Sequence, residues 1–280
     1  MEYFNDYAKL MEDTMKHYIS GMTVNTFGES TNQSIVFIQG FPYDQSIWFN
    51  LAEKFSDFYC ITYDLRGLGE SYVGDGQYTM EFYVEDLFSI MDQLGFEKPI
   101  LCGLSKGGYI ALRAVERNQK SFSGLILCNT NSESEDDQCK LTRSDSINLI
   151  NIEGLGKYID KFLKKCFSDY TLKNNESLFI STYNNALKHY PLGVKGSILA
   201  MMTRTSTTSY LPKIKIPSLI ISGEDDKLID TGSVKKLAEK MVGSEFVIIK
   251  NAGHTLPLEQ PEEFYNVVSN YLLRKFFKKK

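Results

Sequence analysis

The sequence predicts an α/β fold in which helices cross over a mostly parallel β-sheet. Short apolar runs rich in β-branched residues alternate with longer segments of helical period, as in strand–helix–strand units. The composition agrees, because 42% of the 280 residues are hydrophobic and 24% are charged, close to the average of globular chains. At roughly 150 residues per domain, the length fits two small domains or one large α/β domain with an insertion.

The expected strands begin with an antiparallel pair. Residues 16–20 and 22–27 are predicted to pair around a turn at Gly21. Before them, an apolar stripe at helical spacing predicts an amphipathic helix over residues 1–15 that covers the sheet edge. Six further apolar runs are predicted to complete an eight-stranded sheet, at residues 34–39, 59–63, 100–102, 124–128, 218–222 and 246–249.

The remaining segments are predicted to form helices and one insertion. Apolar residues recur every three or four positions from Val84 to Leu94 and stop before Gly95, a common C-terminal cap. A similar helix is predicted around residues 264–271, after Pro261. From about residue 132 to residue 209 the short apolar runs typical of strands no longer occur, and apolar residues follow helical spacing. We therefore expect a helical insertion at residues 132–209 on a core built from residues 1–131 and 210–280.

Charge and cysteine content narrow the function classes. The net charge is −4, so the chain lacks the positive field that attracts nucleic acid. No run approaches the about 18 apolar residues of a membrane span, and the N-terminus lacks the apolar stretch of a signal peptide. The five cysteines are odd in number, and Cys60, Cys102 and Cys128 lie in expected strands, which favours a reducing, cytoplasmic location. The sequence indicates no oligomeric state.

Ser105 lies where an expected strand turns sharply into a helix. The sequence Gly-Leu-Ser-Lys-Gly-Gly at residues 103–108 follows the apolar run that ends at Cys102 and precedes a segment of helical period. A G-x-S-x-G pattern in this context forms a nucleophile elbow, in which small flanking residues permit the strained turn that exposes the serine hydroxyl. The pattern therefore predicts Ser105 as a nucleophile.

A serine nucleophile requires a base and an acid from elsewhere in the chain. The acids Glu224, Asp225 and Asp226 follow the expected strand at 218–222, and His254 follows the one at 246–249. Both groups lie at the carboxyl edge of the predicted sheet, where open α/β folds bind their ligands. Three dispersed histidines form no metal cluster and no phosphate-binding loop motif is present, so we expect neither a metal nor another cofactor.

Together these motifs resemble the α/β-hydrolase superfamily over nearly the whole chain outside the insertion. The matching segments are residues 39–42, 63–71, 103–108, 223–226 and 252–254. Within the superfamily, three segments resemble the branch of 3-oxoadipate enol-lactonases and small carboxylesterases, at residues 102–108, 125–130 and 211–217. The resemblance implies a mostly parallel sheet flanked by helices, with a helical cap formed by the insertion.

The resemblance also implies a catalytic triad. Ser105 would be the nucleophile, His254 the general base and then the general acid, and an aspartate would orient the imidazole. In the family the acid stands three residues after the glycine that ends its strand, which selects Asp226 over its two acidic neighbours. Some members place the acid after the preceding strand, which makes Glu133 a rival.

The oxyanion hole implied by the resemblance uses the backbone N–H groups of Phe41 and Lys106. Gln39 stands where the family usually has histidine, a change expected to spare catalysis because the donor is a backbone group. A lysine directly after the nucleophile is also unusual. We expect the Lys106 side chain to extend to solvent, the alternative being a cation that favours substrates bearing a carboxylate. Asp64 and Arg66 are expected to hold a turn below the site.

The sequence thus predicts a cofactor-independent serine hydrolase that cleaves an ester, thioester or lactone of a small molecule. Carbon–carbon bond hydrolases, perhydrolases and aminopeptidases share the triad and stay open, as does a non-catalytic ligand-binding protein. Dehalogenases and epoxide hydrolases are disfavoured, because they need an aspartate in place of Ser105. Core packing is the favoured role of Trp48, which is nevertheless among the candidates for the substrate pocket. These candidates are Trp48, Tyr158, Phe162, Phe167 and Tyr183.

Overall fold

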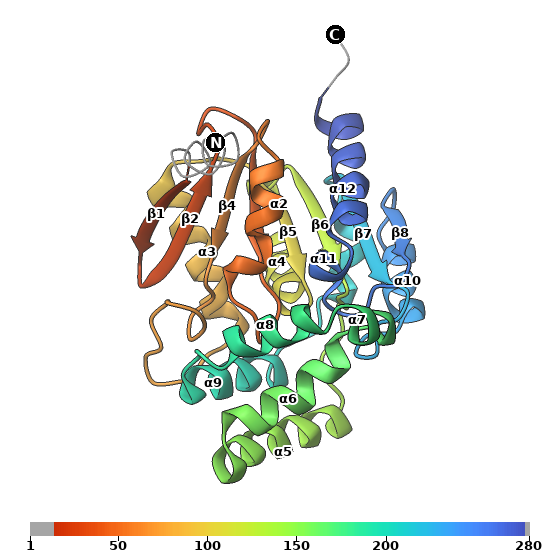
Figure 1. The fold of residues 1–280 in the computed structure, drawn as a ribbon. Helices are drawn as coiled ribbons and strands as arrows, with labels where there is room; N and C mark the ends of the chain where they lie inside the picture. Colours follow the sequence, from red (N-terminus) through yellow and green to blue (C-terminus); the bar gives the residue numbers. More distant parts are fainter. Residues whose placement is uncertain (1–13, 278–280) are drawn as a thin grey trace, which may run out of the picture.

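The computed structural model describes residues 14–277 and is centred on an eight-stranded sheet (Figure 1). The strand order is β1-β2-β4-β3-β5-β6-β7-β8, and only the pairings of β1 with β2 and of β2 with β4 are antiparallel. The strands are β1 (Thr14–Ile19), β2 (Met22–Phe27), β3 (Ser34–Ile38), β4 (Tyr59–Tyr63), β5 (Ile100–Leu104), β6 (Gly124–Cys128), β7 (Ser218–Gly223) and β8 (Glu245–Ile249). The predicted sheet is confirmed, with strand ends that differ by at most two residues.

The helix expected over residues 1–15 falls almost wholly outside the described residues. Its last two positions, Thr14 and Met15, belong to β1, so the predicted end of that helix is wrong. These two residues pair with Phe27 and Thr26 of β2, and the backbone hydrogen bonds of that ladder replace the expected helical turn.

Helices cover both faces of the sheet (Figure 1). On one face α2 (Phe49–Lys54) packs against α12 (Pro261–Phe276), and on the other α3 (Met80–Leu94) packs against α4 (Lys106–Asn118). The sequence signals explain the bounds of α3, because the Thr79 side chain caps its N-terminus and Gly95 ends it with a φ of 68°. The remaining core elements are η1 (Gln45–Trp48), η2 (Gln119–Ser121), η3 (Thr208–Lys213), α10 (Thr231–Lys240) and α11 (Leu256–Glu259).

The central strands are buried on both faces, as their continuous apolar runs require. Every residue of β3, β4, β5 and β6 is buried. The thiols of Cys60, Cys102 and Cys128 lie in these strands as free cysteines, where they pack as small apolar groups. Within residues 14–277, none of the helices has both the length and the apolar character needed to cross a bilayer.

Five helices between β6 and β7 gather at one end of the sheet, and we call them the insertion helices (Figure 1). They are α5 (Asp137–Glu153), α6 (Leu155–Cys166), α7 (Asp169–Asn174), α8 (Glu176–Ala186) and α9 (Pro191–Met202). Amphipathic spacing explains α6, which buries Tyr158, Ile159 and Leu163 along one stripe.

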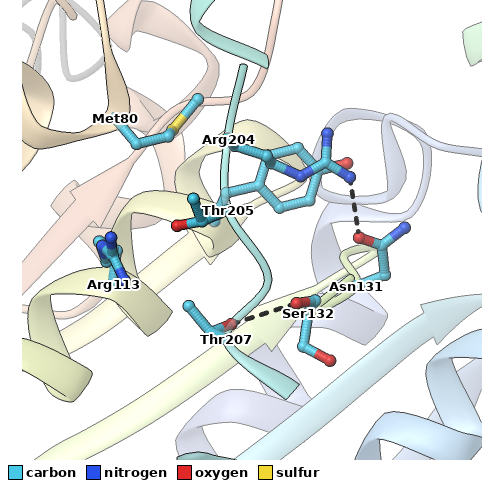
Figure 2. A pocket seen from close by; sticks show the side chains of 8 residues that line it. Met80, Arg113, Asn131, Ser132, Arg204, Thr205 and Thr207 are labelled. Carbon is cyan, nitrogen blue, oxygen red and sulfur yellow. Dashed lines mark hydrogen bonds between the residues drawn. The ribbon is translucent and has the colours of Figure 1, made fainter. Parts of the chain in front are cut away.

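The two chain ends of the insertion are joined to each other, as Figure 2 shows. The Thr207 N–H and the Thr207 hydroxyl both donate to the Ser132 carbonyl, over 2.8 and 3.4 Å, and the second of these bonds is drawn in Figure 2. The Arg204 guanidinium donates to the Asn131 side chain over 3.2 Å, as drawn in Figure 2. It also donates to Glu135 Oε1, over 2.7 Å. The cavity between these residues measures about 10 Å³, room for about one water molecule rather than a substrate. The exact division at residues 132 and 209 stays a prediction, which these contacts support.

Candidate active site

Ser105 occupies the sharp turn between β5 and α4. Its φ of 51° is a strained value for a residue with a side chain, and the surrounding structure holds it there. The Ser105 N–H donates to the Cys128 carbonyl, and the Thr130 hydroxyl donates to the Ser105 carbonyl, both over 2.8 Å. A side chain at Gly107 would overlap the Ile38 carbonyl oxygen, so the small residues of the motif are required by packing.

His254 and Asp226 form a buried hydrogen-bonded pair. The His254 Nδ1 lies 2.8 Å from Asp226 Oδ2, and the two side chains are 2% and 0% exposed. The other carboxylate oxygen accepts the N–H groups of Leu228 and Ile229, over 2.8 and 3.1 Å. Because the carboxylate accepts at Nδ1, the Nε2 of a neutral His254 is left as a proton acceptor.

The rival acids are not placed to replace Asp226. Glu224 and Asp225 are exposed, on the same turn as the buried Asp226. Glu133 is also exposed, and the hydrogen bond in which it takes part runs from Arg204 to its backbone carbonyl. The geometry therefore supports Asp226 as the partner of His254.

Asn129, which the sequence analysis missed, ties the loops of the site together. Its side-chain amide donates to the carbonyls of Gly253 and His254, over 2.9 and 3.0 Å, and its Oδ1 accepts the Gly223 N–H over 2.7 Å. It follows β6 directly and has a φ of 43°. One amide thus connects the loop of the acid with the loop of the base, next to the Cys128 carbonyl that holds Ser105.

The structure brings Ser105 and the pair of His254 and Asp226 to one edge of the sheet. β5, β6, β7 and β8 are parallel neighbours, so their carboxyl ends lie side by side. Within residues 14–277, no hydrogen bond joins Ser105 Oγ to His254. Such a bond is often long in an enzyme without substrate and tightens when substrate binds.

One candidate oxyanion donor belongs to the elbow itself, and the other to the loop after β3. Lys106 is the first residue of α4, where a helix leaves its N–H without an intrahelical acceptor. Phe41 follows β3 in a loop that Gln39 supports, because the Gln39 amide donates to the Tyr43 carbonyl over 2.8 Å. This contact gives the unusual glutamine a local role that leaves the backbone N–H of Phe41 unchanged.

Comparison with known proteins identifies the family. A family model described as serine aminopeptidase, S33, matches residues 29–261. The chain belongs to this family of α/β-hydrolases. The resemblance found in the sequence is therefore confirmed, and the chain is an enzyme of the α/β-hydrolase fold.

Proteins similar to this chain are named for several different activities. The 3-oxoadipate enol-lactonase 1 of Acinetobacter baylyi is 25% identical, over 90% of this chain and 92% of its own. A proline iminopeptidase of Lactobacillus crispatus is 28% identical, over 87% and 91% of the two chains. A thermophilic esterase from Thermogutta terrifontis superposes with a TM-score of 0.86 at 29% identity, over 93% and 98%. Membership of the family thus leaves the substrate open.

In this S33-family chain the Lys106 side chain does not reach solvent, so that expectation is wrong. The residue is 0% exposed; its Nζ donates to Ser197 Oγ over 3.0 Å and lies 3.8 Å from the centre of the Tyr83 ring. Burial lowers the pKa of the ammonium well below its usual range, and the nearby Asp86 opposes this effect. The helix α9 of the insertion covers the side chain, which sequence spacing could not reveal.

The predicted pocket residues divide into three groups. Trp48 is 0% exposed between Phe37 and Phe264 in the core, as the favoured interpretation expected. Tyr158 and Phe162 stack with each other and contact Phe41, with ring centres 6.3 and 5.5 Å from that of Phe41.

The other two candidates, Phe167 and Tyr183, both contact Phe179, which the sequence analysis missed. None of the five predicted residues lines the cavity of about 130 Å³ between the loop after β3 and α8. Its lining includes Tyr43, Asp44, Ser46, Ser181 and Asn185.

Charged hydrogen bonds hold the turn of Asp64 and Arg66 in this S33-family chain, as expected. The Asp64 carboxylate accepts the N–H groups of Gln45 and Glu70, each over 2.9 Å. Arg66 forms a bidentate ion pair with the largely buried Asp86. Burial raises the pKa of Asp64 to about 6. Neither residue touches the candidate triad, so their role is to hold the turn.

His189 connects this turn to the loop of Phe41. Its Nδ1 accepts the Gly69 N–H over 3.0 Å, so its proton lies on Nε2, which donates to the Pro42 carbonyl over 2.9 Å. The ring is 3% exposed. Burial lowers the pKa of His189, against the opposing effects of the Pro42 carbonyl and Asp44. Protonation would also place a second N–H against the Gly69 donor.

We expect His189 to make the folded state less stable in mild acid. The unfolded chain binds this proton below about pH 6.5, whereas the folded chain resists it, so the free energy of unfolding falls as the pH drops through that range. Asp64 acts in the opposite direction, because its pKa is raised on folding and its contribution is lost as the pH rises through about 6.

His189→Gln isolates the histidine, because Asp64 is the same in both proteins. Urea unfolding between pH 7.5 and 5.5 should show a steeper loss of stability for the wild type than for the variant. Parallel curves would contradict the assignment.

Within residues 14–277, no three histidine, cysteine, aspartate or glutamate side chains are grouped so as to hold a metal ion.

Proposed function

We propose that this enzyme is a cofactor-independent serine hydrolase that cleaves a carboxylic ester, lactone or thioester of a small molecule through an acyl-enzyme. The observation that carries the proposal is the buried pair of His254 and Asp226 at the sheet edge that also presents Ser105 on its strained turn. Similarity to an esterase and to an enol-lactonase supports this substrate class. The insertion helices would act as the cap over the site.

In the proposed reaction His254 Nε2 takes the proton of Ser105, and the serine oxygen attacks the carbonyl carbon. The N–H groups of Phe41 and Lys106 would stabilise the resulting oxyanion, each by about 2.7–4 kcal/mol as judged by removal of such donors elsewhere. The protonated His254 then gives its proton to the leaving group. Water attacks the acyl-enzyme with the same histidine as base, and Asp226 stabilises the imidazolium throughout.

An aminopeptidase is the second candidate, because the family model and the Lactobacillus relative carry such names. It would need carboxylates near the site to hold the substrate amine. In the acidic run at residues 133–137 the buried carboxylate of Glu135 is bound to Arg143 and Arg204, so it is not free to hold an amine. Ester or lactone hydrolysis is therefore the better supported function.

The proposal is tested by labelling and by a substrate panel. A fluorophosphonate probe should attach to Ser105, located by peptide mass spectrometry, and heat-denatured protein serves as the control. Short-chain aryl esters, lactones and thioesters should be cleaved faster than aminoacyl arylamides. Faster cleavage of the arylamides would favour the aminopeptidase, and labelling without ester cleavage would favour a carbon–carbon bond hydrolase or perhydrolase. A protein with neither labelling nor turnover would be a ligand-binding member of the fold.

A further inference from the structure

We propose that the insertion segment from His189 to Ser197 positions both donors of the oxyanion hole, so that His189 and Ser197 are positioning residues for acyl transfer. The proposal rests on the proposed function, because it assigns these residues to the hole formed by Phe41 and Lys106. Under this proposal the insertion covers the substrate and also assists the chemical step.

The first contact fixes the loop of Phe41. The next residue, Pro42, has its carbonyl bound by His189 Nε2, from a position 147 residues further along the chain. The same ring accepts the Gly69 N–H at Nδ1, so it is held at both nitrogens. His189 therefore connects the loop that carries one donor to the turn of the core, and only the neutral ring with its proton on Nε2 satisfies both partners.

The second contact fixes Lys106. Its backbone N–H is the other candidate donor, and its buried Nζ donates to Ser197 Oγ of α9 over 3.0 Å. The Tyr83 hydroxyl lies 3.1 Å from the same Ser197 oxygen, and the Tyr83 ring lies under the Lys106 ammonium. A residue of the insertion is thus bound to the residue that follows the nucleophile.

The segment between His189 and Ser197 packs closely against loops of the core. A side chain at Gly193 would overlap the Gly67 carbonyl oxygen, and one at Gly196 would meet the Gly76 carbonyl and the Tyr78 ring. These glycines let α9 approach the core loops, so His189 and Ser197 sit at fixed places on one supported segment. A third contact comes from α6, where Tyr158 and Phe162 pack on the Phe41 ring.

This arrangement predicts an effect on the chemical step. Oxyanion donors act mainly on charge that develops in the transition state, so their misplacement lowers kcat more than it raises KM. A shift of about 1 Å in such a group can cost on the order of 100-fold in rate. A segment that only covered substrate, or only stabilised the fold, would change KM or the melting temperature instead.

The experiment compares four variants for ester hydrolysis and for the rate of fluorophosphonate labelling. His189→Phe keeps an aromatic ring without the hydrogen bonds, His189→Gln keeps one donor and one acceptor, and Ser197→Ala removes the Lys106 acceptor. Val268→Ala is the matched control, because Val268 is a fully buried apolar residue of α12, outside the insertion. Melting temperatures of all variants are measured in parallel.

We expect His189→Phe and Ser197→Ala to lower kcat and the labelling rate by about 10- to 100-fold, with KM within about twofold. His189→Gln should recover most of the loss, and Val268→Ala should lower the melting temperature with kcat within about twofold of the wild type. The proposal is overturned if the polar variants change only KM or melting temperature, or if Val268→Ala loses as much kcat. If His189→Phe fails to fold, the kcat values and labelling rates of Ser197→Ala and His189→Gln test the proposal instead. A wild type with neither labelling nor ester turnover would instead remove the proposed function itself, and this inference with it.

Discussion

Ser105→Ala is expected to lower kcat/KM for the best ester substrate by on the order of 10⁴- to 10⁶-fold. The alanine leaves His254 and Asp226 paired but removes the only oxygen on the elbow that could attack the substrate carbonyl. What remains should be the hydrolysis that substrate binding and the oxyanion donors support without a nucleophile. Initial rates and the loss of fluorophosphonate labelling measure the effect, and circular dichroism verifies the fold.

Ser132→Ala provides a matched control for this experiment. Ser132 is also 7% exposed and also follows a strand of the parallel sheet, but its hydroxyl bonds Thr208 at the base of the insertion. We expect activity within about threefold of the wild type, because the contact that is lost joins the two ends of the insertion and includes none of Ser105, His254 and Asp226. If the Ser132 variant lost activity and the Ser105 variant kept it, the nucleophile would have been misassigned.

The sheet and the elbow were predictable from sequence because their signals are local. A strand buried on both faces must be apolar along its whole length, and the runs from Tyr59 to Tyr63 and from Gly124 to Cys128 show this directly. The elbow needs small residues next to the serine, because a side chain at Gly107 would overlap the Ile38 carbonyl oxygen. This requirement is visible in the sequence as the G-x-S-x-G motif. The order of acid and base along the chain then selected His254 from three histidines.

The supporting residues were not predictable because their roles depend on contacts between distant segments. Asn129 follows a strand like many polar residues, and only the folded sheet places its amide between Gly223 and Gly253. His189 lies in the insertion, 147 residues from the carbonyl that it binds. The burial of Lys106 arises because α9 covers it, whereas a lysine on the first turn of a helix is exposed in most proteins. Motifs therefore indicate the reacting atoms, and tertiary contacts decide how these atoms are held.

Asp226→Asn is expected to lower kcat/KM by on the order of 10⁴-fold while leaving the fold intact. Leu228 and Ile229 donate their N–H groups to Oδ1, so the amide oxygen of the asparagine stays with them and its NH₂ group faces His254. That NH₂ can only donate, so the His254 Nδ1 becomes an acceptor and the ring proton moves to Nε2. The histidine can then no longer take the proton of Ser105.

Asp225→Asn is the matched control, because it makes the same chemical change one residue earlier on an exposed side chain of the same turn. Its activity should stay within about threefold of the wild type, since no contact with His254 is lost. Glu133→Gln tests the remaining rival in the same assay. A large loss in either control, with Asp226→Asn near wild type, would move the acid of the triad to that residue. If only Asp226→Asn loses much activity and its urea unfolding matches that of the wild type, the loss comes from proton transfer. It does not come from a weaker turn around Asp226.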